Sequence, residues 1–288
     1  MHCKIVAIFA KTHDPRCQDV ANELITWLER RNHIHLIEKS LAHHLKRSDG
    51  MTREEMLIQA EVVVVLGGDG TLLSVARLFY GKDIPILGIN LGSLGFLAEV
   101  TVEELYTELE RCLDGAYNIS PRMMLEVTVI REGKAIKKCP VLNEIVINRV
   151  GVLARIVNLK TKIDQHTLTN FKADGLIIAT PTGSTGYSMS AGGPVIHSQV
   201  NCIVITPICP HTLTSRPIVV TDHSIISIIV TSSLDDKVCL TLDGQIGFDL
   251  LEGDTVEVRK APTCTNLAVP KNCDYFEVLR TKLKWGEC

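Results

Sequence analysis

The sequence predicts an α/β domain with a parallel sheet, followed by a mainly β domain. Short apolar runs alternate with helical patterns over the first hundred residues, and the continuous apolar run at 62–66 suits a strand buried on both faces. From residue 125 onward, strand-like segments follow one another without intervening helices. Alternation of strands and helices is typical of a doubly wound sheet. We therefore expect one domain at 1–98 and another at 99–265, with 266–288 packing back on the first.

The first domain is expected to consist of βα units. Helical patterns are centred on 20–28, 52–60, 71–80 and 101–113, and strands are expected at 5–10, 62–66 and 84–89. Thr52 with Glu55, and Thr101 with Glu104, have the spacing of capping boxes that start helices. Gly115 is the expected stop of the last of these helices.

The second domain is expected to be built from hairpins. A turn is expected at 131–134, and helical spacing returns only at 274–285. Strands are expected at 125–130, 141–148, 156–163, 203–206, 218–220, 225–231, 238–242 and 255–259.

Composition narrows the function classes. The 288 residues are enough for one large domain or two ordinary ones. With 30 Lys and Arg against 33 Asp and Glu, the net charge is -3, so no basic excess favours a nucleic-acid partner. Ten cysteines without a C-x-x-C pair indicate free thiols in a reducing compartment. No apolar stretch reaches the roughly 20 residues of a spanning helix, and none resembles a signal peptide, so we expect a cytoplasmic protein that is not in a membrane.

The strongest local signal is GGDGT at 67–71, placed between a buried strand and a helix. Its glycines allow the backbone to approach a phosphate or ribose, and the helix N-terminus offers N–H groups to an anion. It is neither a Walker loop nor a G-x-G-x-x-G fingerprint. The Asp69 carboxylate would repel a phosphate, so we expect it to accept a proton from an attacking hydroxyl or to organise Mg²⁺. The alternative is a tight turn in which Asp69 caps the helix.

Two further loops have unusual compositions. The Gly-rich turn at 90–96 follows the next strand, and adjacent βα turns open on the same edge of a parallel sheet, although a domain crossover would have a similar composition. The segment 174–194 is rich in hydroxyls and glycines, which a nucleotide can use and an apolar core cannot. Asn143 and Glu144 are polar residues at the start of an apolar strand, and the alternative there is a solvated strand end.

Other catalytic classes lack support. The His and Cys residues show no paired spacing of a zinc site, so no protein-bound metal is expected. There is no G-x-S-x-G elbow and no cysteine in an activated setting, so covalent catalysis is not indicated.

Together the motifs resemble those of bacterial NAD kinases. The family order is followed by GGDGT at 67–71, NLGSLGF at 90–96, NE at 143–144, DGLIIATPTGSTGYSMSAGGP at 174–194, PHTLTSRP at 210–217 and DGQ at 243–245. GGDGT alone also occurs in diacylglycerol-kinase-like and phosphofructokinase-like enzymes. The long Thr/Ser/Gly loop with NE upstream makes the resemblance specific.

The resemblance implies transfer of the γ-phosphoryl group of ATP, with Mg²⁺, to the 2′-hydroxyl of the adenosine ribose of NAD. The product would be NADP. It also implies a Rossmann-like N-terminal domain, a β-rich NAD-binding domain and a homo-oligomer, usually a dimer or tetramer.

The resemblance also implies roles for individual residues. Asp69 would be the proton acceptor, Asn143 and Glu144 would hold a ribose, Asp174 would contact the nicotinamide end, and 185–190 would contact the adenine side. Arg155 and Lys172 fall in a stretch that aligns loosely with the family. The expected NAD contacts are Asp69, Gly70, Asn143, Glu144, Arg155, Lys172, Asp174, Thr185, Gly186, Tyr187, Ser188, Met189, Ser190 and Gln245.

Two other interpretations remain. A lipid or small-molecule kinase would share GGDGT, but the sequence has no amphipathic basic segment for a membrane substrate. A non-catalytic dinucleotide-sensing module would bind NAD without needing Asp69. No loop is a recognisable ATP-binding motif in its own right.

Overall fold

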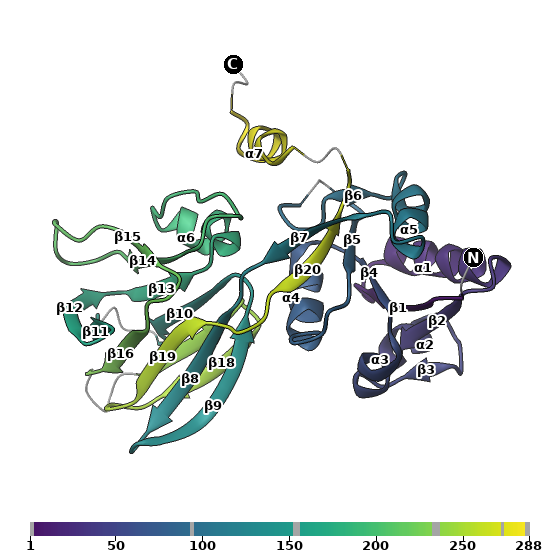
Figure 1. Cartoon of the computed structure of the whole chain (residues 1–288). Helices are drawn as coiled ribbons and strands as arrows, with labels where there is room; N and C mark the ends of the chain where they lie inside the picture. The colour runs from purple at the N-terminus through teal and green to yellow at the C-terminus, as the bar shows by residue number, and fades with distance from the viewer. Residues whose placement is uncertain (1–2, 93–94, 152–155, 232–236, 272–273, 286–288) are drawn as a thin grey trace. The chain divides into compact units, whose positions relative to one another are not determined.

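The computed structural model describes residues 3–92, 95–151, 156–231, 237–271 and 274–285. The chain divides into two compact units (Figure 1). Unit 1 comprises 1–121 together with 265–288, and unit 2 comprises 122–264. The division lies at 121–122, whereas the sequence pattern places it at 98–99.

Unit 1 is built around a mainly parallel sheet with the strand order β3-β2-β1-β4-β5-β20-β7, and β6 pairs with β5. The central strands β1 and β4 are continuous apolar runs and are buried, and both have the predicted bounds. The elements are β1 (Ile5–Ala10), α1 (Pro15–Arg30), β2 (Ile34–Glu38), α2 (Lys39–His44), β3 (Gly50–Met51), α3 (Arg53–Gln59), β4 (Val62–Leu66), α4 (Asp69–Leu78), β5 (Ile86–Asn90), β6 (Val100–Thr101), α5 (Leu105–Leu113), β7 (Asn118–Arg122), β20 (Thr265–Val269) and α7 (Tyr275–Leu283).

Side chains cap the N-termini of helices α1, α3 and α7 in unit 1. The predicted capping box of Thr52 and Glu55 is present at α3. The pair Thr101 and Glu104 does not cap α5: the Glu104 carboxylate accepts hydrogen bonds from the Thr101 N–H at 3.1 Å and hydroxyl at 3.0 Å, and no side chain caps the helix. This pair therefore fixes the turn before α5.

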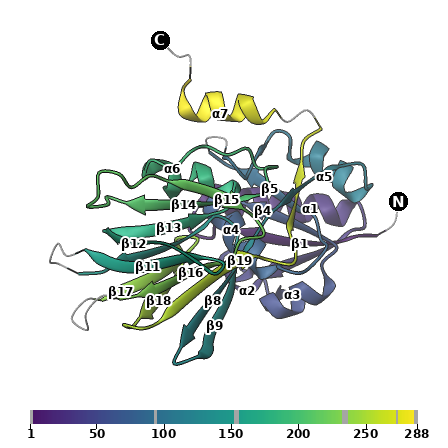
Figure 2. The same ribbon diagram turned by 60° about the vertical axis from the view of Figure 1, so that its left-hand side comes forward.

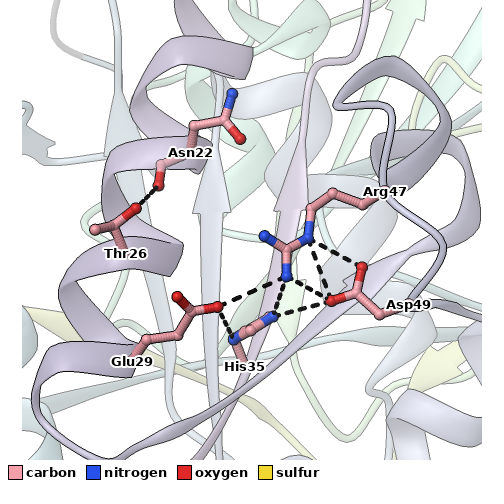
Figure 3. Close-up of polar contacts among 6 residues, drawn as sticks. All are labelled: Asn22, Thr26, Glu29, His35, Arg47 and Asp49. Atoms are coloured by element: carbon pink, nitrogen blue, oxygen red, sulfur yellow. Dashed lines mark hydrogen bonds and ion pairs between the residues drawn. The ribbon is translucent and has the colours of Figure 1, made fainter.

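A charged cluster joins α1, β2 and the turn before β3 (Figure 3). His35 lies 3.2 Å from Asp49 and 3.7 Å from Glu29, and Arg47 lies 2.7 Å from Asp49. The Arg47 guanidinium holds the pKa of the Asp49 carboxyl well below its usual range. The cluster links this end of the sheet to helix α1.

Unit 2 consists of two six-stranded antiparallel sheets, with the orders β15-β14-β13-β10-β17-β18 and β12-β11-β16-β19-β8-β9 (Figure 2). Apolar residues of both sheets form one buried core. The expected β-rich second domain is confirmed. The elements are β8 (Leu125–Arg131), β9 (Lys134–Val141), β10 (Glu144–Arg149), β11 (Val157–Ile163), β12 (His166–Ala173), β13 (Gly175–Ala179), α6 (Tyr187–Ser190), β14 (Cys202–Ile208), β15 (Ile218–Thr221), β16 (Ile226–Val230), β17 (Val238–Leu242), β18 (Ile246–Leu250) and β19 (Thr255–Lys260), with a 3₁₀ turn at Thr182–Thr185.

The strand expected at 141–148 is divided in the structure. Strand β9 ends at Val141 and β10 begins at Glu144. Between them, the Asp243 carboxylate accepts hydrogen bonds from the N–H groups of Leu142 and Asn143. A contact made from 100 residues away along the chain thus sets the start of β10.

Among the helices of the described residues, none combines the length and apolar character needed to cross a membrane.

Candidate functional site

The first set of candidate residues lies on the GGDGT loop of unit 1, between β4 and α4. The Asp69 carboxylate accepts three backbone hydrogen bonds: Oδ2 from Phe96 N–H at 3.0 Å, and Oδ1 from Leu97 and Ala98 N–H, each at 3.1 Å. Helix α4 starts after Gly68 and has no side-chain cap, so Asp69 does not act as the helix cap. The carboxylate instead holds the second Gly-rich turn.

Three of the four acceptor positions of Asp69 are therefore occupied. A carboxylate has about four lone-pair sites, two on each oxygen. Oδ1 accepts two N–H groups and Oδ2 accepts one, which leaves one position on Oδ2 for a ligand. The geometry fixes the carboxylate and identifies the atom that could accept a further proton or hydrogen bond.

Glycine at position 95 is required by this arrangement. A Cβ atom there would lie 2.1 Å from Asp69 Oδ1, far inside van der Waals contact. The Gly95 N–H also donates to the Ala98 carbonyl at 3.1 Å, which closes the turn around the carboxylate.

A cavity of about 300 Å³ opens beside this carboxylate. The described part of its wall is made by residues at the ends of the neighbouring strands β1, β4 and β5 and by Lys282 of α7. The strand-end residues are Lys11, Asp14, Arg16, Cys17, Gly67, Gly68, Asp69, Asn90, Leu91, Gly92 and Gly95. Ligands of open α/β sheets bind at this carboxyl edge. The expectation that the two Gly-rich turns share one edge is confirmed.

Cations dominate the charge of this cavity. Asp14 is paired with Arg16 at 2.9 Å, which lowers the pKa of Asp14, and Asp69 is held by N–H groups. Lys11 and Lys282 have no carboxylate within ion-pair distance among the described residues. Together with the uncapped N-terminus of α4, these ammonium groups favour an anion.

The second set of candidate residues lies at the start of β10 in unit 2. Asp243 is 4% exposed, and its carboxylate accepts N–H groups from Leu142 at 3.1 Å, Asn143 at 2.7 Å and Glu144 at 3.3 Å. Asp243 therefore positions the Asn143–Glu144 pair. From the DGQ motif at 243–245 only Gln245 was predicted to have a role, so the role of Asp243 was missed.

Asn143 and Glu144 present buried acceptors without partners. Neither Asn143 Oδ1 nor Glu144 Oε2 has a hydrogen-bond partner in the described part of the chain, and Glu144 is 7% exposed. Burial, reinforced by the Asp243 charge, raises the pKa of Glu144 to about 7. Leaving such acceptors unpaired is costly, so the pair is suited to a ligand that donates hydrogen bonds, such as a ribose diol.

The Thr/Ser/Gly loop lies against this pair. A Cβ atom on Gly186 would lie 3.0 Å from Glu144 Oε2 and 3.7 Å from Asn143 Nδ2. A Cβ atom on Gly183 would lie 2.1 Å from the Asn143 carbonyl oxygen, so only glycine fits there. The glycines of this loop thus allow it to approach the unpartnered acceptors.

Several hydroxyls of the loop are used within the protein. Ser188 is fully buried, and its hydroxyl bonds with that of Thr206 at 2.9 Å. The Thr185 hydroxyl donates to the Thr182 carbonyl at 3.1 Å. Around these internal bonds Tyr187 and Ser190 are exposed, while Met189 is half-buried.

The other described residues predicted to contact NAD lie in different parts of the two units. Gln245 is exposed just after the Asp243 turn, and Gly70 is exposed in the first turn of α4. The register pairs Glu144 with Ala179 and Asn148 with Gly175, which puts Lys172 and Asp174 beyond the other end of β13. Within one chain, they are not brought together with Glu144. Arg155 lies outside the described residues.

Comparison with known proteins gives consistent results. Residues 6–117 match the ATP-NAD kinase N-terminal domain, and residues 142–269 match the ATP-NAD kinase C-terminal domain. The chain is 58% identical over 284 residues to an NAD kinase of Trichlorobacter lovleyi and 56% identical to one of Geobacter sulfurreducens, and each alignment covers 99% of both chains.

Solved structures are also similar. A yeast NADH kinase complexed with NADH superposes with a TM-score of 0.91 at 27% identity, covering 99% of this chain and 89% of that one. An Archaeoglobus fulgidus NAD kinase in complex with ATP gives a TM-score of 0.76 at 24% identity, covering 97% and 98%, and shows the same fold. The chain therefore belongs to the ATP-NAD kinase family.

Proposed function

We propose that the chain phosphorylates NAD, transferring the γ-phosphoryl group of ATP to the 2′-hydroxyl of the adenosine ribose to give NADP. The observation that carries this proposal is the Asp69 carboxylate, held by three N–H groups with one acceptor position open beside a cationic cavity. The family match and the relatives named NAD kinase support the same reaction.

In the proposed reaction, Asp69 is the proton acceptor. The 2′-oxygen forms a bond to the γ-phosphorus, the bond from that phosphorus to the β–γ bridging oxygen breaks, and the hydroxyl proton passes to Asp69 Oδ2. Phosphoryl transfer depends mostly on positioning and charge stabilisation, so one fixed carboxylate is sufficient as a base. The three N–H donors hold it in place.

Asn143 and Glu144 are proposed to hold a ribose. Two hydroxyls of a ribose would donate to Asn143 Oδ1 and Glu144 Oε2, the two acceptors that lack a partner. Gly186 allows the sugar to approach because no side chain covers Glu144. The remaining proposed NAD contacts are Gly70, Arg155, Lys172, Asp174, Thr185, Tyr187, Ser188, Met189, Ser190 and Gln245.

The phosphates of ATP are proposed to occupy the cavity beside Gly68, where the N-terminus of α4 has no side-chain cap. No three His, Cys, Asp or Glu side chains among the described residues are grouped as metal ligands. This donor set fits a Mg²⁺ that is held mainly by nucleotide phosphates, with Asp69 as the nearby carboxylate. When bound, the ion would neutralise charge on the phosphates.

We also propose a cytoplasmic homo-oligomer, a dimer or tetramer, without nucleic-acid or membrane partners. The free thiols of the described cysteines support the cytoplasmic location, and the net charge of -3 supports the absence of a nucleic-acid partner. A second copy would supply its own Lys172 and Asp174, which lie a strand's length from Glu144 within one chain.

Replacement of Asp69 tests its proposed role. Asp69→Asn should still bind NAD but lose on the order of 10²–10⁴ in turnover, the usual contribution of a positioned base. Asp19→Asn, at an exposed position of α1 outside the cavity, is the matched control. Turnover within a factor of about two of wild type would remove Asp69 from this role.

A further inference from the structure

The cavity beside the GGDGT loop contains one residue that is remote in sequence from all the others. Three wall segments follow β1, β4 and β5, as expected for an α/β sheet. The fourth contribution is Lys282, on the C-terminal helix α7 of the same unit. No motif in the sequence connects this residue with the loop.

Both carboxylates of the cavity already have hydrogen-bond partners. Asp14 bonds to Arg16 through both carboxylate oxygens, and the same guanidinium donates to the Leu91 carbonyl at 3.2 Å. Asp69 is bound by three backbone N–H groups. Neither carboxylate therefore requires Lys11 or Lys282 as an ion-pair partner.

Two ammonium groups are consequently available to a ligand. Lys282 is half-buried and Lys11 is exposed, and neither lies within ion-pair distance of a carboxylate among the described residues. Among the described residues of this cavity, three cationic side chains, Lys11, Arg16 and Lys282, face two carboxylates, so its net charge is positive and favours an anion. A chain of two or three phosphates has the matching charge, whereas a neutral sugar or base does not.

We propose that Lys282 of α7, together with Lys11, binds the phosphate chain of the phosphoryl donor, which makes the C-terminal helix part of the donor site. This inference rests on the proposed function. It assigns α7 a role in substrate binding, in addition to any role in packing. The ammonium groups would oppose the negative charge of the phosphates and hold the terminal phosphate beside Asp69.

The test measures donor binding separately from catalysis. Inorganic tripolyphosphate is titrated into the full-length protein by calorimetry without NAD, and KM for ATP and for NAD are measured in parallel. Lys282→Gln should weaken tripolyphosphate binding and raise KM for ATP by about 10-fold, because the variant loses a charge-assisted hydrogen bond to the phosphates. KM for NAD should stay unchanged, and Lys282→Arg should retain most of the affinity.

The matched control is Lys284→Gln, which removes the same charge from the residue that directly follows α7, outside the cavity wall. It should leave both readouts unchanged. The inference is overturned if Lys282→Gln binds tripolyphosphate as wild type does, if Lys284→Gln loses the same affinity, or if the wild type does not bind tripolyphosphate. If Lys282-dependent binding is present but no NADP forms, the proposed function fails and the phosphate site stands.

Discussion

Burial of the Glu144 carboxylate is expected to make the folded chain less stable as the pH rises. Its pKa is raised from 4.5 to about 7, mainly by burial and further by the Asp243 charge. The unfolded chain releases this proton near pH 4.5, whereas the folded chain retains it until about pH 7. The free energy of unfolding therefore falls across this interval and stays reduced above it. At about 1.36 kcal/mol per pH unit, the loss is on the order of 3 kcal/mol.

The variant Glu144→Gln removes the ionisation and retains the size of the side chain. In urea unfolding followed by far-UV circular dichroism, it should be roughly 2–3 kcal/mol more stable than wild type at pH 8 and differ little at pH 5. Glu252→Gln, at an exposed turn of the same unit, should show no such pH-dependent difference. If Glu144→Gln were less stable than wild type at pH 8, the carboxylate would have to be ionised and paired, and the reasoning would be refuted.

Two further substitutions test contacts within unit 1. Gly95→Ala would place a Cβ 2.1 Å from Asp69 Oδ1 and should lower kcat on the order of 10²-fold by displacing the base. The control Gly247→Ala, at an exposed position of β18 outside the cavity, places its Cβ in ordinary contact, 3.7 Å from Cys239 Sγ, and should be nearly neutral in the same steady-state assay. Equal activities would show that the turn does not set the carboxylate. Asp49→Asn should modestly lower the free energy of unfolding at neutral pH, because Arg47 lowers the pKa of Asp49. This difference should vanish as acid protonates Asp49, and a difference that persists in urea titrations at low pH would contradict the ion-pair explanation.

The elements that depend on local pattern were predictable from the sequence. Strands β1 and β4 are uninterrupted apolar runs, and the capping box of Thr52 with Glu55 starts α3 as expected. In each case the signal lies within a few adjacent residues. The Gly-rich turns also revealed the candidate sites, because their composition is unsuited to a core.

Features that depend on distant residues were not predictable. The start of β10 is set by Asp243. The return of 266–288 to the first domain was expected, but strand β20 and its pairing with β5 were not. Thr101 and Glu104 have the spacing of a capping box, yet no side chain caps α5 and Glu104 instead accepts hydrogen bonds from Thr101. No periodic pattern in the sequence predicts that Glu144 Oε2 is buried without a hydrogen-bond partner among the described residues. None predicts that Lys282 lies in the wall of the cavity.

The most direct test of the account is an end-point assay of the purified protein with NAD, ATP and Mg²⁺, in which NADP is read with a strictly NADP-dependent dehydrogenase. The account predicts NADP that requires all three components and is lost with Asp69→Asn. Binding of NAD without consumption of ATP, or the absence of NADP under these conditions, would contradict it.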